Sequence, residues 1–96
     1  MRNIVSRISS LEQVARFWQD CIAEFSRMRE KDVVYLMLSV CTSDYFTNLY
    51  DSGKNPNINT IFDALMSLDV SKQDIETRGY YWGIIRNNLY NLGIYL

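Results

Sequence analysis

The side chains that most often carry out catalysis are scarce in this 96-residue sequence. It contains no histidine, which removes the commonest general base and every Ser-His or Cys-His nucleophile pair. Carboxylates such as Asp74 and Glu76 can act as acid and base, but nothing in the sequence around them predicts the apolar pocket that tunes such a pair. We therefore predict no catalytic residue and a protein that is not an enzyme.

The two cysteines, Cys21 and Cys41, both lie in apolar runs. Two cysteines without a histidine cannot complete a structural zinc site, and a secreted domain of this size usually carries four or more cysteines. We expect reduced, buried thiols that act as small apolar side chains, with no metal and no cofactor. No stretch approaches the roughly 20 apolar residues of a membrane span, so we expect a cytoplasmic protein without a membrane partner.

Tyrosines next to aspartates form the strongest binding signal. The chain has seven tyrosines, and so many cannot all be buried, because each hydroxyl needs a partner or water. Tyrosine is also enriched in the hot spots of protein interfaces. The sequence predicts a protein-binding patch that consists of Asp44, Tyr45, Tyr50 and Asp51.

Charge is unevenly distributed, although the net charge is only −1. Residues 32–76 contain seven acidic and two basic side chains, whereas the segments on either side each have a small excess of basic ones. An acidic block repels phosphate backbones and favours a basic protein surface. We therefore expect the partner to be another protein with a basic surface.

The hydrophobic pattern predicts helices throughout. Ser10 and Gln13 have capping-box spacing, and the apolar residues that follow fall at helical spacing, which predicts a helix over 11–28. The run Val33–Cys41 permits a buried strand or a helix. Because apolar residues continue to Tyr50 at helical spacing, we favour one helix of about 19 residues, or two joined near Thr42 and Ser43.

After a polar linker, 51–57, three more helices are expected over 61–68, 72–77 and 80–91, with Gly93 as a C-terminal cap. This order resembles the three-helix part of a helix-turn-helix domain. The resemblance implies a nucleic-acid-binding surface that consists of Lys72, Arg78, Arg86 and Asn87. Phosphate binding needs more cations than these, so nucleic acid is the alternative partner and not the expected one.

Together these features predict an all-α protein in which residues 1–96 form a single small domain of four to five helices. Its expected function is that of a non-enzymatic protein-binding module that masks a basic surface. Small acidic immunity proteins, antitoxins and phage-encoded inhibitors act in this way. A helix-turn-helix-like regulator is one alternative. A homo-oligomeric structural subunit, paired through the apolar stripe of the first helix, is another.

Overall fold

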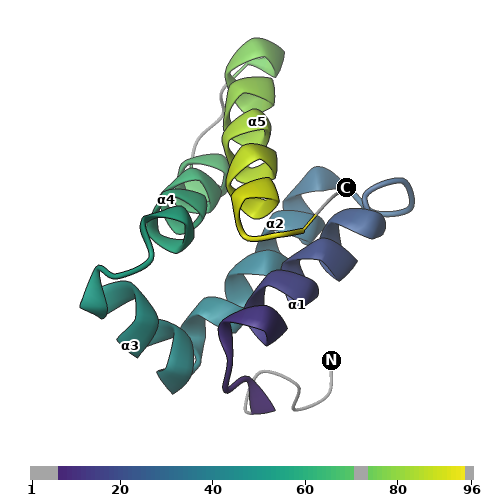
Figure 1. The fold of residues 1–96 in the computed structure, drawn as a ribbon. Coiled ribbons are helices and arrows are strands. Elements are labelled where there is room, and N and C mark those ends of the chain that lie inside the picture. Colours follow the sequence, from purple (N-terminus) through teal and green to yellow (C-terminus); the bar gives the residue numbers. More distant parts are fainter. Residues whose placement is uncertain (1–6, 71–73, 95–96) are drawn as a thin grey trace.

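In the computed structural model, residues 7–70 and 74–94 are described, and they form an all-α fold without a strand in those ranges (Figure 1). The prediction of an all-α protein is confirmed. The elements, in chain order, are α1 (Leu11–Ala23), α2 (Glu30–Ser39), the 3-10 turn η2 (Val40–Thr42), α3 (Asp44–Ser52), α4 (Pro56–Val70) and α5 (Ile75–Asn91).

Helix α1 begins as predicted and ends earlier than predicted. The Ser10 hydroxyl accepts the Gln13 amide at 3.2 Å, as the N-cap of a capping box does. The Gln13 side chain reaches back and accepts the amide of Ser9, one residue before the N-cap, at 2.7 Å. The helix was expected to reach residue 28, but residues 24–28 form turns instead. There the Phe25 amide donates to a carbonyl only three residues back, at 3.0 Å.

The run Val33–Cys41 is helical, and the chain forms two helices joined near Ser43, as one of the two alternatives predicted. Ser43 itself has an extended backbone, and its hydroxyl accepts the Phe46 amide at 3.1 Å. This N-cap ends η2 and starts α3 in a new direction. Gly53, with a φ of 66°, then ends α3 in the left-handed conformation that glycine adopts without steric cost.

Helix α4 is longer than the predicted 61–68, and the linker is shorter than expected. The helix begins at Pro56, because a proline at the first helical position loses no hydrogen bond and already has a helical φ. The early start also buries Ile58 in the core.

Helix α5 is continuous where two helices, 72–77 and 80–91, were expected. Asp74 caps it by accepting the Thr77 amide at 2.8 Å, and Gly79 lies inside it. The C-terminal part is therefore a pair of long helices, and the prediction of a trihelical unit there was wrong; residues 71–73 lie outside the described ranges. Gly93, with a φ of 88°, forms the predicted C-terminal cap, and the Ile94 amide donates to the Leu89 carbonyl at 2.9 Å.

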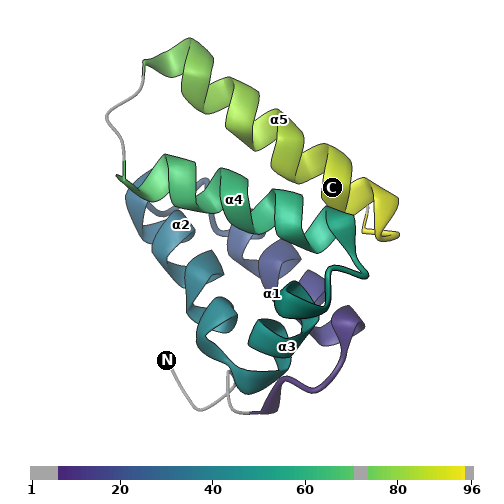
Figure 2. The ribbon, with the colours of Figure 1, turned by 90° about the vertical axis from the view of Figure 1, so that its left-hand side faces the viewer.

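The helices form two groups (Figure 2). Helices α4 and α5 run side by side in opposite directions, and α4 packs on its other side against α2. Helices α1, α2 and α3 lie below α4 in that view. Helix α5 is thus the outermost element, held mainly by α4.

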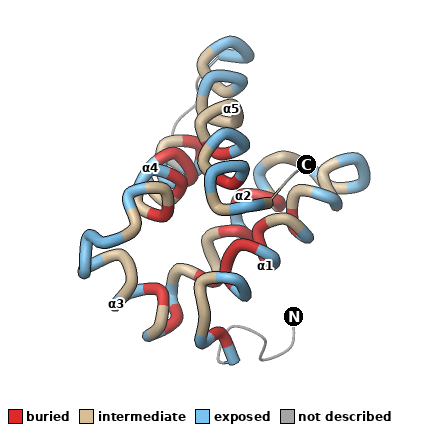
Figure 3. The backbone as a smooth tube through the Cα atoms, in the orientation of Figure 1, coloured by how far each residue is buried: buried red, intermediate tan, exposed pale blue. Residues whose placement is uncertain are grey.

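One hydrophobic core joins all five helices. Its largest fully buried side chain is Trp18, whose indole N–H donates to the Met37 carbonyl at 2.7 Å and whose ring meets Phe46 edge-on. Buried residues are concentrated in α1, α2 and α4, whereas Ile75 and Glu76 at the start of α5 are exposed (Figure 3). Every helix has an exposed side, and those of α3 and α5 carry residues of the predicted sites.

Candidate functional site

The exposed face of α3 carries two carboxylates. Asp44 and Asp51 are seven residues apart, two helical turns, so they lie on the same side of α3. Both are exposed, and neither forms an ion pair with a described residue. Phe46 is buried on the opposite side of the helix. We call the exposed side that carries Asp44 and Asp51 the acidic face of α3.

The two predicted tyrosines flank this face instead of standing on it. Tyr45 is half-buried and packs against the core. Tyr50 stacks on Phe46 with ring centroids 6.4 Å apart and meets Phe62 edge-on at 5.0 Å. Both rings are partly used for packing. They therefore border the acidic face, and each ring exposes only one edge to a partner.

The Tyr50 hydroxyl connects α3 to a third carboxylate. It donates to Asp63 Oδ1 of α4 at 3.3 Å. The negative charge of Asp63, then loss of solvation, the hydrogen bond itself and the charge of Asp51 all raise the pKa of Tyr50. Sequence spacing could not identify Asp63, because the contact joins residues 13 positions apart on different helices.

The residues predicted for nucleic-acid binding do not form one surface. Lys72 lies outside the described residues. Arg78 is paired with the Glu30 carboxylate of α2, and the Trp82 indole N–H donates to the other oxygen of that carboxylate at 3.1 Å. Arg86 and Asn87 are exposed on α5. Of the predicted cations in the described ranges, only Arg86 is exposed.

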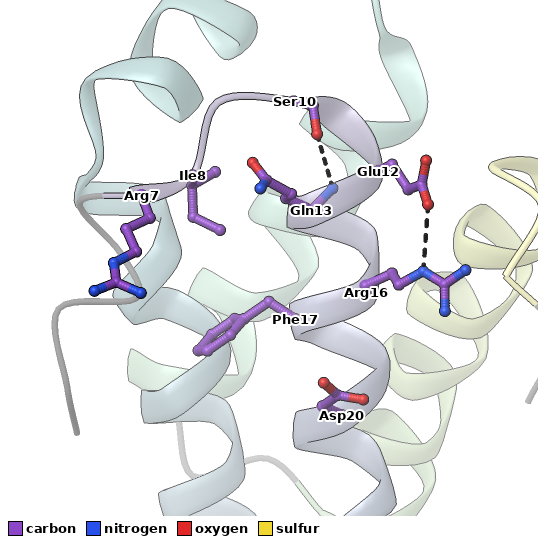
Figure 4. A pocket seen from close by; sticks show the side chains of 8 residues that line it. All are labelled: Arg7, Ile8, Ser10, Glu12, Gln13, Arg16, Phe17 and Asp20. Atoms are coloured by element: carbon purple, nitrogen blue, oxygen red, sulfur yellow. Dashed lines mark hydrogen bonds and ion pairs between the residues drawn. The ribbon is translucent and has the colours of Figure 1, made fainter.

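A pocket of about 400 Å³ lies at the start of α1 (Figure 4). Its polar side chains do not converge. Phe17 points toward Arg7 and Ile8, whereas Glu12 and Arg16 pair with each other at 3.4 Å on the other side of the helix. Of the two carboxylates among the described residues that line it, Glu12 is paired with Arg16, and Asp20 lies farther along α1.

The cysteines lie apart from any candidate site. Burial, followed by the charges of Asp20 and Glu24, raises the pKa of Cys21 to about 12, and burial alone raises the pKa of Cys41 to about 12. Both are free thiols, and within residues 7–70 and 74–94 no group of three or more potential ligands could hold a metal ion.

Comparison with known proteins does not identify a family for this chain. No protein-family model, no curated protein and no solved structure matches this chain. None of the described helices combines the length and the apolar character that crossing a bilayer requires.

Proposed function

We propose that this protein is a non-enzymatic protein-binding module whose acidic face of α3 binds a basic surface of another protein. The observation that supports this most directly is the pair Asp44 and Asp51, exposed two turns apart on one side of α3 without a described ion-pair partner. Carboxylates that the fold leaves unpaired are available to a cationic partner.

The surroundings of the acidic face support an electrostatic role. Residues 44–63, which cover α3 and the first half of α4, contain three acidic side chains and one basic side chain, Lys54. Asp63 adds its charge beside Tyr50, and half-exposed tyrosines supply apolar area next to the carboxylates. Charge of one sign on one surface speeds encounter with a partner of opposite sign and disfavours nucleic acid.

In size and charge the protein is of the same type as small immunity proteins, antitoxins and phage-encoded inhibitors. These act by covering a basic active site or a nucleic-acid-binding site of their target. The proposed action is the same: the acidic face of α3 covers a basic surface and excludes its normal ligand, and no chemical step is required.

The two alternative functions find less support. Glu30 neutralises Arg78, which leaves Arg86 as the one exposed cation of the predicted nucleic-acid set within the described residues, too few for phosphate binding. The apolar stripe of α1, the expected dimer contact, is occupied within the chain, since Val14, Trp18 and Cys21 are all buried.

The test is charge reversal on the acidic face. The tagged protein is used to capture its partner from host lysate with nuclease present, and affinity for the purified partner is then measured. Asp44→Lys/Asp51→Lys should weaken binding at least about a hundredfold, since each lost charge pair is worth about 1.4 kcal/mol or more.

The matched control is Asp20→Lys/Asp69→Lys, which changes the net charge equally at two exposed aspartates away from this face. It should bind within about threefold of the wild type, the range expected for charges outside the contact. Equal affinity of the two double variants would contradict the proposed surface. Recovery that depends on nucleic acid would support the helix-turn-helix alternative instead.

A further inference from the structure

Helices α1 and α5 have few contacts with each other, in contrast to α4 and α5. Between them lies a hollow of about 320 Å³, which is lined by Ile22 of α1, Phe25 just after α1, and Trp82 and Arg86 of α5. Three of these four side chains are apolar and half-buried, and the fourth is an exposed cation. We call the space between these two helices the α1–α5 groove.

The aromatic wall of the groove is fixed in place. The Trp82 ring meets Phe25 edge-on with centroids 5.0 Å apart, and its N–H donates to Glu30 Oε2 at 3.1 Å. An indole held from both sides has little conformational freedom left to lose. Binding against it therefore costs less entropy than binding against a mobile side chain.

The charge of the groove is positive. The charge of the nearby Glu30 is compensated by Arg78, and that of Glu12, which lines a second hollow at the start of α1, is compensated by Arg16. Arg86 has no ion pair with any described residue. A ligand that fills the apolar part of the groove can therefore pair a carboxylate with Arg86.

The spread of apolar side chains along α5 and just after it indicates a helix and not a small molecule. The second hollow, of about 320 Å³, lies between the start of α1 and the residues that follow α5. Its apolar lining residues are Leu11, Ala15, Leu92 and Ile94, and Gly93 and the Glu12–Arg16 ion pair complete the lining. From Trp82 to Leu92 a helix rises about 15 Å, close to three turns. Ile75, 89% exposed and seven residues before Trp82, extends the same face of α5 in the other direction.

We propose that the α1–α5 groove binds an amphipathic helix of another protein, which inserts apolar side chains beside Trp82 and pairs a carboxylate with Arg86. Helices bind in grooves through apolar residues at spacings of three and four. This partner is acidic, whereas the partner of the α3 face is basic, so the two sites bind different segments and the groove does not depend on the function proposed above.

The test uses peptides of about 16 residues, long enough for about four helical turns, displayed as a random library and selected against the full chain. Peptides selected on the wild type should carry Asp or Glu within one turn of an apolar pair. Peptides selected on the Arg86→Glu variant should instead carry Lys or Arg at that position. The best wild-type peptide should bind Arg86→Glu at least about tenfold more weakly, the effect of one lost charge pair.

The two tryptophans report where the peptide binds. In NMR titrations the indole N–H signal of Trp82 should shift, while that of Trp18, buried in the core against the Met37 carbonyl, should stay in place. The Asp44→Lys/Asp51→Lys variant should bind the same peptide with unchanged affinity, which separates this site from the α3 face.

Three results would overturn the proposal. One is selection without any acidic preference, and another is a Trp82 signal that does not move on binding. The third is a Trp82 signal that shifts with protein concentration alone, together with a dimer in sedimentation, because a second copy of the chain would then be the occupant of the groove.

Discussion

Cys21 and Cys41 show how the fold changes the chemistry of single residues. Each thiol would ordinarily lose its proton near pH 9.0, and burial raises the pKa of each to about 12. The reactive form of cysteine is the thiolate, so both side chains are inert at neutral pH and contribute to stability as apolar groups.

The raised pKa values predict a loss of stability in alkali. Above pH 9 the thiols ionise in the unfolded chain while they stay protonated in the folded one, so the unfolded state binds fewer protons and the free energy of unfolding falls as pH rises toward 12. We expect a fall of about 2 kcal/mol per pH unit for the two thiols together. This is less than the full linkage of about 1.4 kcal/mol for each, because Cys41 is partly exposed while Cys21 is buried.

The measurement is urea denaturation of the wild type and of Cys21→Ala/Cys41→Ala between about pH 8 and about pH 10.5. This range lies on either side of the pKa of a thiol in the unfolded chain, so the difference between the two proteins isolates the effect of the thiols. Tyrosines and lysines ionise equally in both proteins, so their contribution cancels in the difference. The double variant should lose stability less steeply with pH. Parallel curves would show that the thiols ionise in the folded protein as they do in the unfolded one.

At the level of elements, two glycines show how the backbone conformation decides the effect of a substitution. An added Cβ at Gly83, inside α5, or at Gly53, after α3, would meet no atom within 4 Å. The two positions differ in backbone conformation, since Gly53 has a φ of 66° and Gly83 is helical. The effect of alanine at each should therefore be decided by the backbone and not by packing.

Gly83→Ala should stabilise the protein by about 1 kcal/mol, because alanine is the better helix former. Gly53→Ala should destabilise it by about 1 kcal/mol, the cost of a left-handed conformation for a residue with a Cβ. Thermal denaturation of both variants shows whether each change raises or lowers the stability of the protein. A destabilising Gly83→Ala would indicate that another helix packs against that face of α5 in solution.

Local signals in the sequence predicted the element type and several helix ends. The capping box at Ser10 and the glycine at position 93 both act as predicted, because capping needs only residues within one turn. The starts of α4 and α5 were misplaced because several polar residues near each start can cap equally well. Tertiary contacts decide between them, such as the burial of Ile58 in the first turn of α4.

The candidate sites were only partly predictable for the same reason. Asp44 and Asp51 could be placed on one face of a helix from their spacing alone. The bond from Tyr50 to Asp63 and the contacts of Glu30 with Arg78 and Trp82 join different helices. No periodicity in the sequence encodes such pairs, so the α1–α5 groove became visible only in the structure.

At the scale of the whole molecule, the position of α5 depends on two kinds of contact. Ile85 and Leu89 bury its second half in the core. Its first half extends outward, and there Glu30 of α2 pairs with Arg78 and accepts the Trp82 indole N–H. Each member of the Glu30–Arg78 pair is 25% exposed, so water screens the pair less than it would a fully exposed one.

We expect Glu30→Ala to loosen the first half of α5 selectively. The change leaves Arg78 without this ion pair and the Trp82 N–H without its acceptor, which should cost about 1–3 kcal/mol, as for other partly buried polar groups that lose a partner. Amide hydrogen exchange should accelerate in residues 78–84. It should change little in residues 87–91, where Leu89 remains buried and the Asn91 side chain donates to Asn57 of α4 at 3.2 Å.

Glu30→Gln is the matched variant, since its side-chain oxygen can still accept the Trp82 N–H while the negative charge is lost. If the hydrogen bond to the indole holds α5, this variant should exchange nearly as slowly as the wild type. If the ion pair with Arg78 holds it, Glu30→Gln should resemble Glu30→Ala. Exchange that rises equally along all of α5 in both variants would instead mean that the helix moves as one unit with α4, and the α1–α5 groove would then widen along its whole length.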